Sequence, residues 1–310
     1  MSAALTDAPG GTRGRLNRAY LGMVAEPWLY LLPSLLLIGG VMLLPLVIGI
    51  GYAFQEFNLL RPGAAKWVGL QNFRDLWDDA QFWRAARNTL VWTGASVALQ
   101  FALGLGLALL LNTQFHGKKL VQALVFLPWA VPTFLTALTF SWLLNPVIGP
   151  IPHWLFALGA LEEPYNILGN PDTALWGPIL ANVWYGVPFF AITLLAALSA
   201  IPSELYEAAE IDGASAWQAF TKITLPFLAP MIVITVMLRT IWIANFADLI
   251  YVMTGGGPAN STQILSSYIF TTAFKRLDFG HASAIAVVLL ALLMAYAAIL
   301  LAVRSRLVRH

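Results

Sequence analysis

The sequence predicts an all-α, polytopic membrane protein with six transmembrane helices. Of its 310 residues, 59% are apolar and only 10% are charged, whereas a soluble domain carries about 25% charged residues. The mean hydropathy is +0.74, and several long segments contain no Asp, Glu, Lys or Arg. Because a bilayer-spanning helix needs about 20 mostly apolar residues, each of these segments can cross a membrane. The composition excludes a soluble globular protein.

Other parts of the composition exclude several kinds of site. The net charge of +2 is the difference between 17 basic and 15 acidic residues, and no Lys/Arg run is present that could follow a phosphate backbone. Nucleic acid is therefore not an expected partner. The chain has no cysteine, which excludes disulfides, thiolate metal sites and a cysteine nucleophile. Its four histidines form no His-x-x-x-His pair, so we expect no metal site on a helix.

The predicted spans follow from the gaps between charged residues. The charge-free segments are 27–55, 88–117, 120–161, 173–203 and 279–303. The third is too long for one span, and Pro146, Pro150 and Pro152 end its helix near Asn145, so the remainder is expected to lie at the membrane interface. A sixth apolar stretch is interrupted by two charges. The six helices are predicted near 28–54, 88–112, 120–144, 174–200, 227–252 and 281–303.

The amino-terminal 26 residues are mostly polar and precede an apolar run longer than the core of a signal peptide, so we expect the first helix to remain as an anchor. With both termini in the cytoplasm, nine Lys/Arg lie on the inner side and seven outside. This count favours residues 1–26 and 304–310 as cytoplasmic tails flanking a transmembrane domain, 27–303. Loop 55–87, called the cap segment below, mixes both charges and is predicted to fold as a small amphipathic cap.

The connection between spans four and five, residues 201–226, is expected to form two short helices. Ser203 is suited to cap the first helix, and Glu204 and Glu207 lie in its first turns, where carboxylates interact favourably with a helix N-terminus. Asp212-Gly213 predicts the turn that follows. We refer to this connection as the 201–226 loop.

Ser215 and Gln218 have the spacing of a capping box and predict the start of the second helix of the 201–226 loop. Pro226 is expected to end this loop. Small or apolar residues recur with helical spacing across both helices; they are Ala209, Gly213, Ala216, Phe220 and Ile223. Helices this short are unstable alone, so they must pack on something.

Two surfaces could receive this loop. Lipid headgroups are one, because an amphipathic segment can lie on a bilayer. The first helix, however, carries four carboxylates that an anionic leaflet repels; they are Glu204, Glu207, Glu210 and Asp212. The acidic charge and the small residues favour a basic groove on a protein.

The same loop resembles the EAA loop of permease subunits of binding-protein-dependent ABC importers. The resemblance rests on Glu207-Ala208-Ala209, Gly213, Ile223 and Leu225-Pro226 at the family's spacing. Further segments are similar to the first permease of maltose-type and glycerol-3-phosphate-type importers, and together they extend over nearly the whole chain. They are residues 69–73 (GLQNF), 88–89 (NT), 124–132, 254–258 (TGGGP) and 280–284 (GHASA).

The resemblance implies the ABC importer permease fold, with the 201–226 loop inserted into a cleft of an ATPase subunit. The residues expected to make this coupling contact are Glu207, Ala208, Ala209, Asp212, Gly213, Trp217 and Phe220. It further implies a second permease subunit, two ATPase subunits, an extracytoplasmic solute-binding protein and a sugar or sugar-like substrate, in a bacterial inner membrane.

No ATP site is expected on this chain. The Walker A pattern needs an upstream glycine and a hydroxyl after Gly-Lys, and the only Gly-Lys, at Gly117-Lys118, has neither. Gly255-Gly256-Gly257-Pro258 could be taken for a phosphate cradle, but no helix start follows it and proline removes one donor; a flexible outer loop is the favoured interpretation. ATP and magnesium are expected on the partner ATPase, with no cofactor or metal here.

The charges inside the fifth span identify a candidate substrate pathway, because ionised groups in mid-bilayer are costly. Arg239 lies twelve residues into this span, about 18 Å from its inner end, while Asp248 falls near the outer interface. Trp242 and Asn245 share a face with Arg239. Tyr185 and Asn182 of the fourth span lie at matching depths, so these six residues are the candidates.

Two interpretations of Arg239 stay open from the sequence: a structural arginine that pairs with a carboxylate or carbonyl, and a residue that contacts substrate. Trp184 and Trp242 can equally be packing residues. For the whole chain, a secondary active transporter is the alternative function, although no second copy of the EAA-like segment is present as an inverted repeat would require. An intramembrane enzyme lacks a catalytic constellation.

Overall fold

The computed structural model describes residues 30–60 and 65–307. The predicted tail 1–26, the first two residues of the predicted first span and residues 308–310 lie outside the described residues. The chain divides into two units, Met1–Tyr52 and Ala53–His310, and each is considered by itself.

The described part of the first unit is one apolar helix, Tyr30–Tyr52. It includes a π-helical stretch, η1 (Ile38–Leu43), followed by α2 (Leu44–Tyr52), and none of its side chains is buried. A helix satisfies its own backbone groups, so such a segment is stable in lipid, where exposed apolar side chains carry no penalty.

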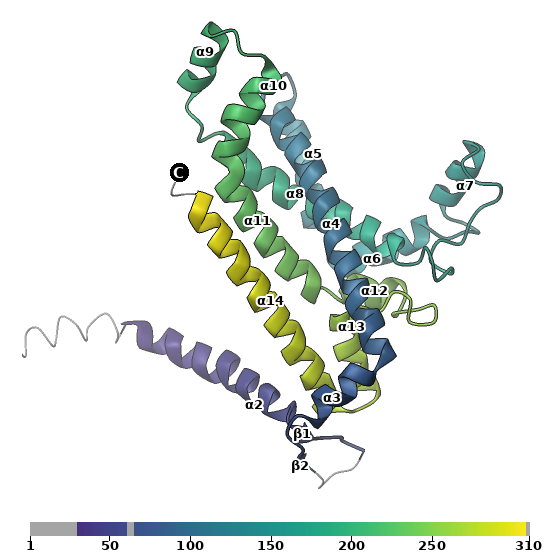
Figure 1. Ribbon diagram of the computed structural model, residues 1–310. Coiled ribbons are helices and arrows are strands. Elements are labelled where there is room, and N and C mark those ends of the chain that lie inside the picture. Colours follow the sequence, from purple (N-terminus) through teal and green to yellow (C-terminus); the bar gives the residue numbers. More distant parts are fainter. Residues whose placement is uncertain (1–29, 61–64, 308–310) are drawn as a thin grey trace, which may run out of the picture. The chain divides into compact units, whose positions relative to one another are not determined.

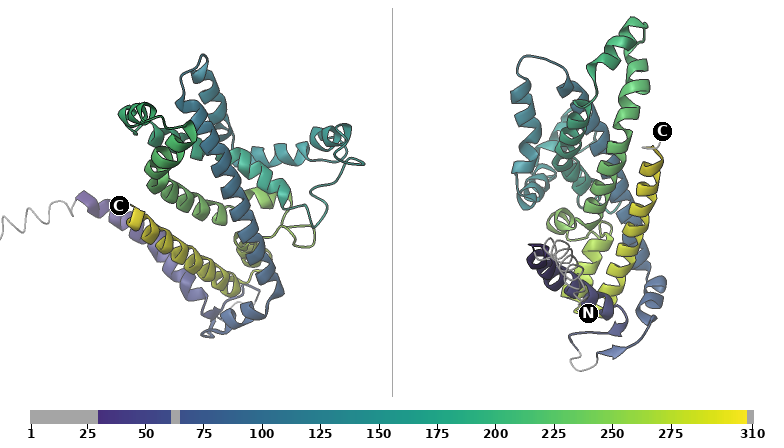
Figure 2. Two further views of the ribbon diagram at one scale, coloured as in Figure 1. Left: turned by 45° about the horizontal axis from the view of Figure 1, so that its top comes forward. Right: turned by 90° about the vertical axis from the view of Figure 1, so that its left-hand side faces the viewer.

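Four long helices form the frame of the second unit: α4 (Ala80–Asn112), α8 (Trp176–Leu198), α11 (Leu225–Asn245) and α14 (Phe279–Leu307). α4 packs along α8, and α11 lies against both and against α14 (Figures 1 and 2). The core shared by α4, α8 and α11 contains Trp92, Phe190 and Leu228, all fully buried.

Gly104 sets the close approach of α4 to α8. A Cβ atom placed there would collide with the Cβ of Phe190 and would lie 3.1 Å from the backbone nitrogen of Ala191. We expect Gly104→Leu to force the two helices apart and to lower the free energy of unfolding by about 1–3 kcal/mol or more. The measurement is the folded fraction of detergent-solubilised protein after a heat step.

Gly106→Leu is the matched control, because Gly106 lies two residues further along α4, is exposed, and has nothing within 4 Å of a Cβ atom. Equal loss of folded protein in both variants would contradict this account of the α4–α8 contact.

The third predicted span, 120–144, is not one straight helix. α5 (Lys118–Ala130) and α6 (Thr133–Leu143) meet at a bend of 97°. The cause is Pro132, which disfavours helical backbone at the preceding residue; Val131 accordingly adopts extended angles, φ −90° and ψ 125°. A short helix, α7 (Pro150–Ala157), lies in the segment predicted to be interfacial.

The fifth predicted span, 227–252, is corrected at both ends. Helical structure already begins at α10 (Ala216–Ala219) and continues through the π-helical η2 (Phe220–Thr224) into α11. Pro226 therefore does not end the 201–226 loop before a new helix begins. It lies within continuous helical structure, because the wide turn of η2 before it accommodates a residue without an N–H.

The other end of α11 breaks where the sequence predicts continuous helix. Phe246 leaves the helical conformation (φ −92°, ψ 84°), and α12 (Asp248–Met253) starts a new helix. Asp248 lies in the first turn of α12, where a carboxylate interacts favourably with the helix dipole. Asp248 thus belongs to a different helix from Arg239.

The cap segment folds into a two-stranded hairpin, β1 (Gln55–Glu56) and β2 (Lys66–Trp67), followed by α3 (Gln71–Asp78). Asp79 then caps α4 by accepting a 2.8 Å hydrogen bond from the Gln81 backbone N–H. Because of this cap, α4 begins eight residues before the predicted start at 88 and extends beyond the apolar segment.

Asp79 also links the cap segment to the short helices α13 (Leu265–Phe270) and η3 (Thr271–Lys275). The Tyr268 hydroxyl donates to Asp79 at 2.5 Å and accepts from Arg276 at 3.4 Å. Burial and the hydrogen bond to Asp79 raise the pKa of Tyr268 to about 12, so the phenol keeps the proton it donates at neutral pH.

Candidate functional site

The 201–226 loop and the cap segment lie at opposite ends of the second unit (Figure 1). Within the loop, α9 (Ser203–Ile211) starts at Ser203 itself and the N-cap position belongs to Pro202, so the predicted capping role of Ser203 is wrong. The second helix has the predicted cap: Ser215 accepts from the Gln218 backbone N–H at 3.3 Å, and the Gln218 side chain accepts from the Ser215 N–H at 2.7 Å.

Two features fix the path of the chain between these helices. Gly213 follows α9 with φ +73°, a conformation that side-chain-bearing residues rarely adopt. The hydroxyls of Tyr206 and Thr224 lie 2.9 Å apart and join α9 to η2. A hollow of about 350 Å³ lies between the helices, with Ala209, Gly213 and Lys222 in its lining.

The structure brings all seven predicted coupling residues onto this one loop. Glu207, Ala208, Asp212, Gly213 and Trp217 are exposed, whereas Ala209 and Phe220 are half-buried. Trp217 is 71% exposed although its ring is apolar, and neighbouring Ile211 is 87% exposed. Exposed apolar rings beside carboxylates suit a protein partner that covers the rings and offers basic side chains.

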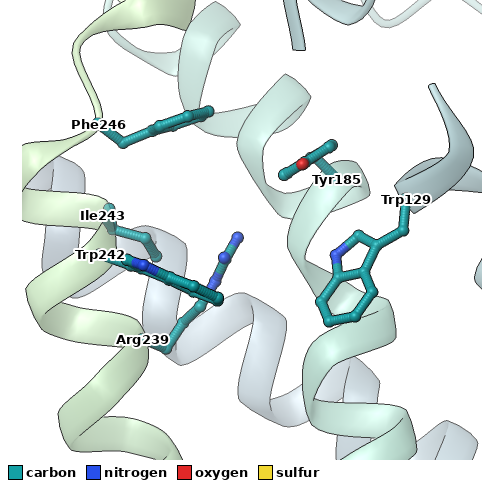
Figure 3. Close-up of a pocket in the computed structure, with 6 residues that line it drawn as sticks. All are labelled: Trp129, Tyr185, Arg239, Trp242, Ile243 and Phe246. Atoms are coloured by element: carbon teal, nitrogen blue, oxygen red, sulfur yellow. The ribbon is translucent and has the colours of Figure 1, made fainter. Parts of the chain in front are cut away.

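A second site is a cavity of about 360 Å³ between α5, α8 and the end of α11 (Figure 3). Its lining residues are Trp129, Tyr185, Arg239, Trp242, Ile243 and Phe246. The rings of Tyr185 and Phe246 stack with centroids 6.2 Å apart. The break after α11 places Phe246 in the cavity wall. One cation therefore faces a chamber otherwise lined by aromatic and aliphatic groups.

A buried polar arrangement positions Arg239. Its Nε donates to the Gln100 side-chain oxygen at 2.7 Å, and the Gln100 amide donates to the Asn182 carbonyl at 2.8 Å. Arg239 is 5% exposed, and its guanidinium carbon lies 5.9 Å from the ring centroids of both Phe189 and Trp242. These cation–π contacts offset part of the cost of burying the charge.

Gly186 makes room for this arrangement. A Cβ atom at this position would collide with the side chains of Gln100 and Arg239. The glycine on α8 therefore allows a polar side chain from α4 and a cation from α11 to meet beside it.

The structure brings together three of the six predicted pathway residues: Tyr185, Arg239 and Trp242 line the cavity. Asn182 lies behind the cavity, fully buried, and its side-chain amide has no hydrogen-bond partner in the described chain. Asn245 and Asp248 do not line it. Asn245 is exposed and donates to the Ile241 carbonyl at 2.9 Å; Asp248 lies in α12, beyond the break at Phe246.

The two interpretations of Arg239 can now be compared. Among residues 30–60 and 65–307, no carboxylate forms an ion pair with it. The side-chain carbonyl of Gln100 accepts from its Nε at 2.7 Å, which is the carbonyl pairing expected of a structural arginine, but this partner carries no negative charge. Trp184 behaves as a packing residue, with its ring 5.8 Å from that of Phe140.

The sequence-based prediction does not include Gln100 or three residues of the cavity lining, Trp129, Ile243 and Phe246. A signal existed for Gln100, because it is the one Asn or Gln between Asn88 and Asn112 in the second span. An amide, like an ionised group, is costly in the bilayer unless it is hydrogen-bonded. Trp129 and Phe246 reach the cavity through helix breaks that periodicity does not show.

In the described chain, no group of three His, Asp or Glu residues could hold a metal ion. This leaves the two sites above, an exposed acidic loop and an aromatic cavity with one cation, as the features that function must explain.

Comparisons with known proteins give a consistent result. Residues 100–309 match the family described as "Binding-protein-dependent transport system inner membrane component". A probable ABC transporter permease of Brucella suis is 37% identical over 90% of this chain and 96% of its own length. The trehalose/maltose transport system permease protein MalF of Thermococcus litoralis is 38% identical, over 76% of this chain and 79% of its own.

A solved structure agrees with these relatives. A chain of a bacterial alginate ABC transporter, crystallised in complex with an alginate pentasaccharide-bound periplasmic protein, has 26% sequence identity and a TM-score of 0.77. The match covers 93% of this chain and 95% of that chain. None of these comparisons supports a secondary transporter.

Proposed function

Because the chain belongs to the family of binding-protein-dependent inner membrane transport components, we propose that its cavity passes a sugar or sugar-like solute across the membrane. The chain is the permease subunit of an ABC importer, with the helical fold of that family and several membrane-spanning helices. Permeases of this family are not enzymes, and ATP is hydrolysed on a separate subunit.

The observation that carries the sugar proposal is the lining of the cavity. Four aromatic rings, from Trp129, Tyr185, Trp242 and Phe246, provide flat apolar surfaces against which sugar rings can stack. Arg239 provides donors for hydroxyl oxygens in place of water. Two relatives are named for trehalose/maltose and alginate transport, which supports the same substrate class for this chain.

The partners follow from the exposed 201–226 loop. We propose that it docks into an ATPase subunit, that a second permease completes the pathway, and that two ATPases bind the ATP and magnesium. An extracytoplasmic binding protein delivers the solute; the periplasmic protein in the alginate complex supports this. The proposed location is a bacterial inner membrane, with both termini in the cytoplasm.

Truncation of Trp242 tests the cavity. We expect Trp242→Ala to lower sugar uptake by the reconstituted importer about tenfold or more, because the ring is exposed in the cavity and lies against Arg239. Asn245→Ala should have a much smaller effect, since the Asn245 side chain bonds its own helix. The measurement is uptake of labelled maltose, trehalose and an alginate oligosaccharide into proteoliposomes, per assembled complex.

The control is Trp154→Ala, which removes another exposed tryptophan, 67% accessible, from α7. Binding of the solute-binding protein should be unchanged in all three variants. Wild-type uptake by Trp242→Ala would remove this cavity from the transport pathway.

A further inference from the structure

Arg239 lacks a counter-ion in the described chain. A guanidinium has five N–H donors, and the only hydrogen bond that Arg239 makes to described residues uses Nε, toward the neutral amide of Gln100. The aromatic rings of Phe189 and Trp242 also contact it without supplying negative charge. At 5% exposure, this is a cation withdrawn from water without a charged partner, an arrangement that costs stability.

The unpaired end of the cation faces the cavity. Figure 3 shows the guanidinium extending past Trp242 into the space between Tyr185 and Trp129. Gln100 holds the Nε side of the group and Nη2 lies beside Gly186, while Arg239 still forms part of the chamber lining. A planar guanidinium edge matches two oxygens of a carboxylate, sulfonate or phosphate.

We propose that the solute carried through this cavity is an anionic sugar, whose carboxylate, sulfonate or phosphate group pairs with Arg239 while the sugar rings stack on the aromatic walls. This inference rests on the proposed function, since it names the charge of the proposed substrate. It explains why a costly cation lies in an otherwise neutral chamber: the incoming anion supplies the missing charge.

The test uses the complete importer with its binding protein in proteoliposomes. The probes are matched pairs of disaccharides, in which a neutral parent is compared with its uronate, its sulfonate and its phosphate ester. Each is assayed for uptake and for stimulation of ATP hydrolysis by wild type, Arg239→Gln, Arg239→Lys and the control Arg304→Gln. Arg304 is exposed in the last turn of α14, far along the chain from the cavity residues.

We expect at least one anionic probe to be taken up about tenfold or more faster than its neutral parent. Arg239→Gln should remove this preference, Arg239→Lys should keep part of it, and Arg304→Gln should match wild type. Complex yield is measured in parallel, because a carboxylate of the partner permease could pair with Arg239 instead. If Arg239→Gln lowers the yield of assembled complex but leaves uptake of the anionic probe per complex unchanged, the inference is overturned.

The inference also fails if neutral parents are carried as well as or better than all their anionic derivatives; the proposed sugar function then still stands. Failure of every probe, neutral and anionic, to stimulate ATP hydrolysis would instead count against the sugar function itself.

Discussion

We expect Gly213→Leu to abolish solute-stimulated ATP hydrolysis and uptake by the assembled importer, reducing both by about a hundredfold or more, while membrane insertion is unchanged. Gly213 has φ +73°, so leucine strains the turn between α9 and α10. Inside the chain, a Cβ at this position meets nothing within 4 Å. We therefore expect any loss of activity beyond that strain to come from the proposed ATPase contact, because a leucine side chain would block the close approach of the ATPase.

Gly159→Leu separates these two causes. Gly159 has the same φ of +73° and nothing within 4 Å of a Cβ atom, but it lies after α7, outside the 201–226 loop. We expect this variant to keep coupled ATP hydrolysis. Comparable losses in both variants would attribute the effect to backbone strain alone and would remove the evidence for docking at Gly213.

Charge reversal at Glu207 tests the electrostatic part of the same contact. Glu207 is exposed and forms no ion pair in the described chain, so Glu207→Lys should leave the fold intact and repel a basic groove. Coupled ATP hydrolysis should fall about tenfold or more. Raising the salt concentration should restore part of it, because salt screens the repulsion between exposed charges. Glu163→Lys, on an exposed loop position beyond α7, is the control; normal coupling in Glu207→Lys would contradict the assignment.

Five of the six predicted spans are long apolar helices in the described chain, and they could be located from sequence because the bilayer penalises charge so strongly. Charge-free segments such as 88–117 locate α4 and its neighbours without any knowledge of packing. The helix ends were less accurate, since they depend on local hydrogen bonds. α4 starts at the Asp79 cap rather than at the edge of the apolar segment, and helical structure continues from α10 through η2 into α11, which contains Pro226.

Much of the 201–226 loop was predictable because its determinants are local, although Ser203 does not cap α9 and Pro226 does not end the helical segment. The capping box of Ser215 and Gln218, the turn at Gly213 and the acidic first helix all arise from neighbours in the chain. The cavity depends on distant pairs instead. Gln100 and Arg239 are 139 residues apart, and their hydrogen bond forms only where Gly186 leaves room between them.

Helix breaks account for the remaining errors at the cavity. The prediction of one helix over 227–252 placed Asn245 on the face of Arg239 and Asp248 near the outer interface. In the structure Asn245 bonds its own helix, Asp248 belongs to α12, and the turn at Phe246 puts the Phe246 ring in the lining. The bend at Val131 and Pro132 similarly decides where Trp129 lies. Periodicity assumes an unbroken helix, so it cannot anticipate which side chains a break moves.

The second large effect concerns assembly. The apolar helix Tyr30–Tyr52 buries no side chain in its own unit, and the acidic loop exposes Trp217 and Ile211. In the proposed assembly, a second permease completes the pathway. We therefore expect the chain expressed alone to be poorly stable in detergent and inactive, and to gain stability and transport only with a second permease and ATPase subunits.

The most direct measurement of the central claim is sugar uptake into proteoliposomes that contain this chain with and without its ATPase partner, in the presence of the binding protein and ATP. The account predicts uptake that requires the ATPase, stops when ATP is omitted and persists when ion gradients are abolished. Uptake by this chain without any ATPase, driven by a proton or sodium gradient, would contradict it.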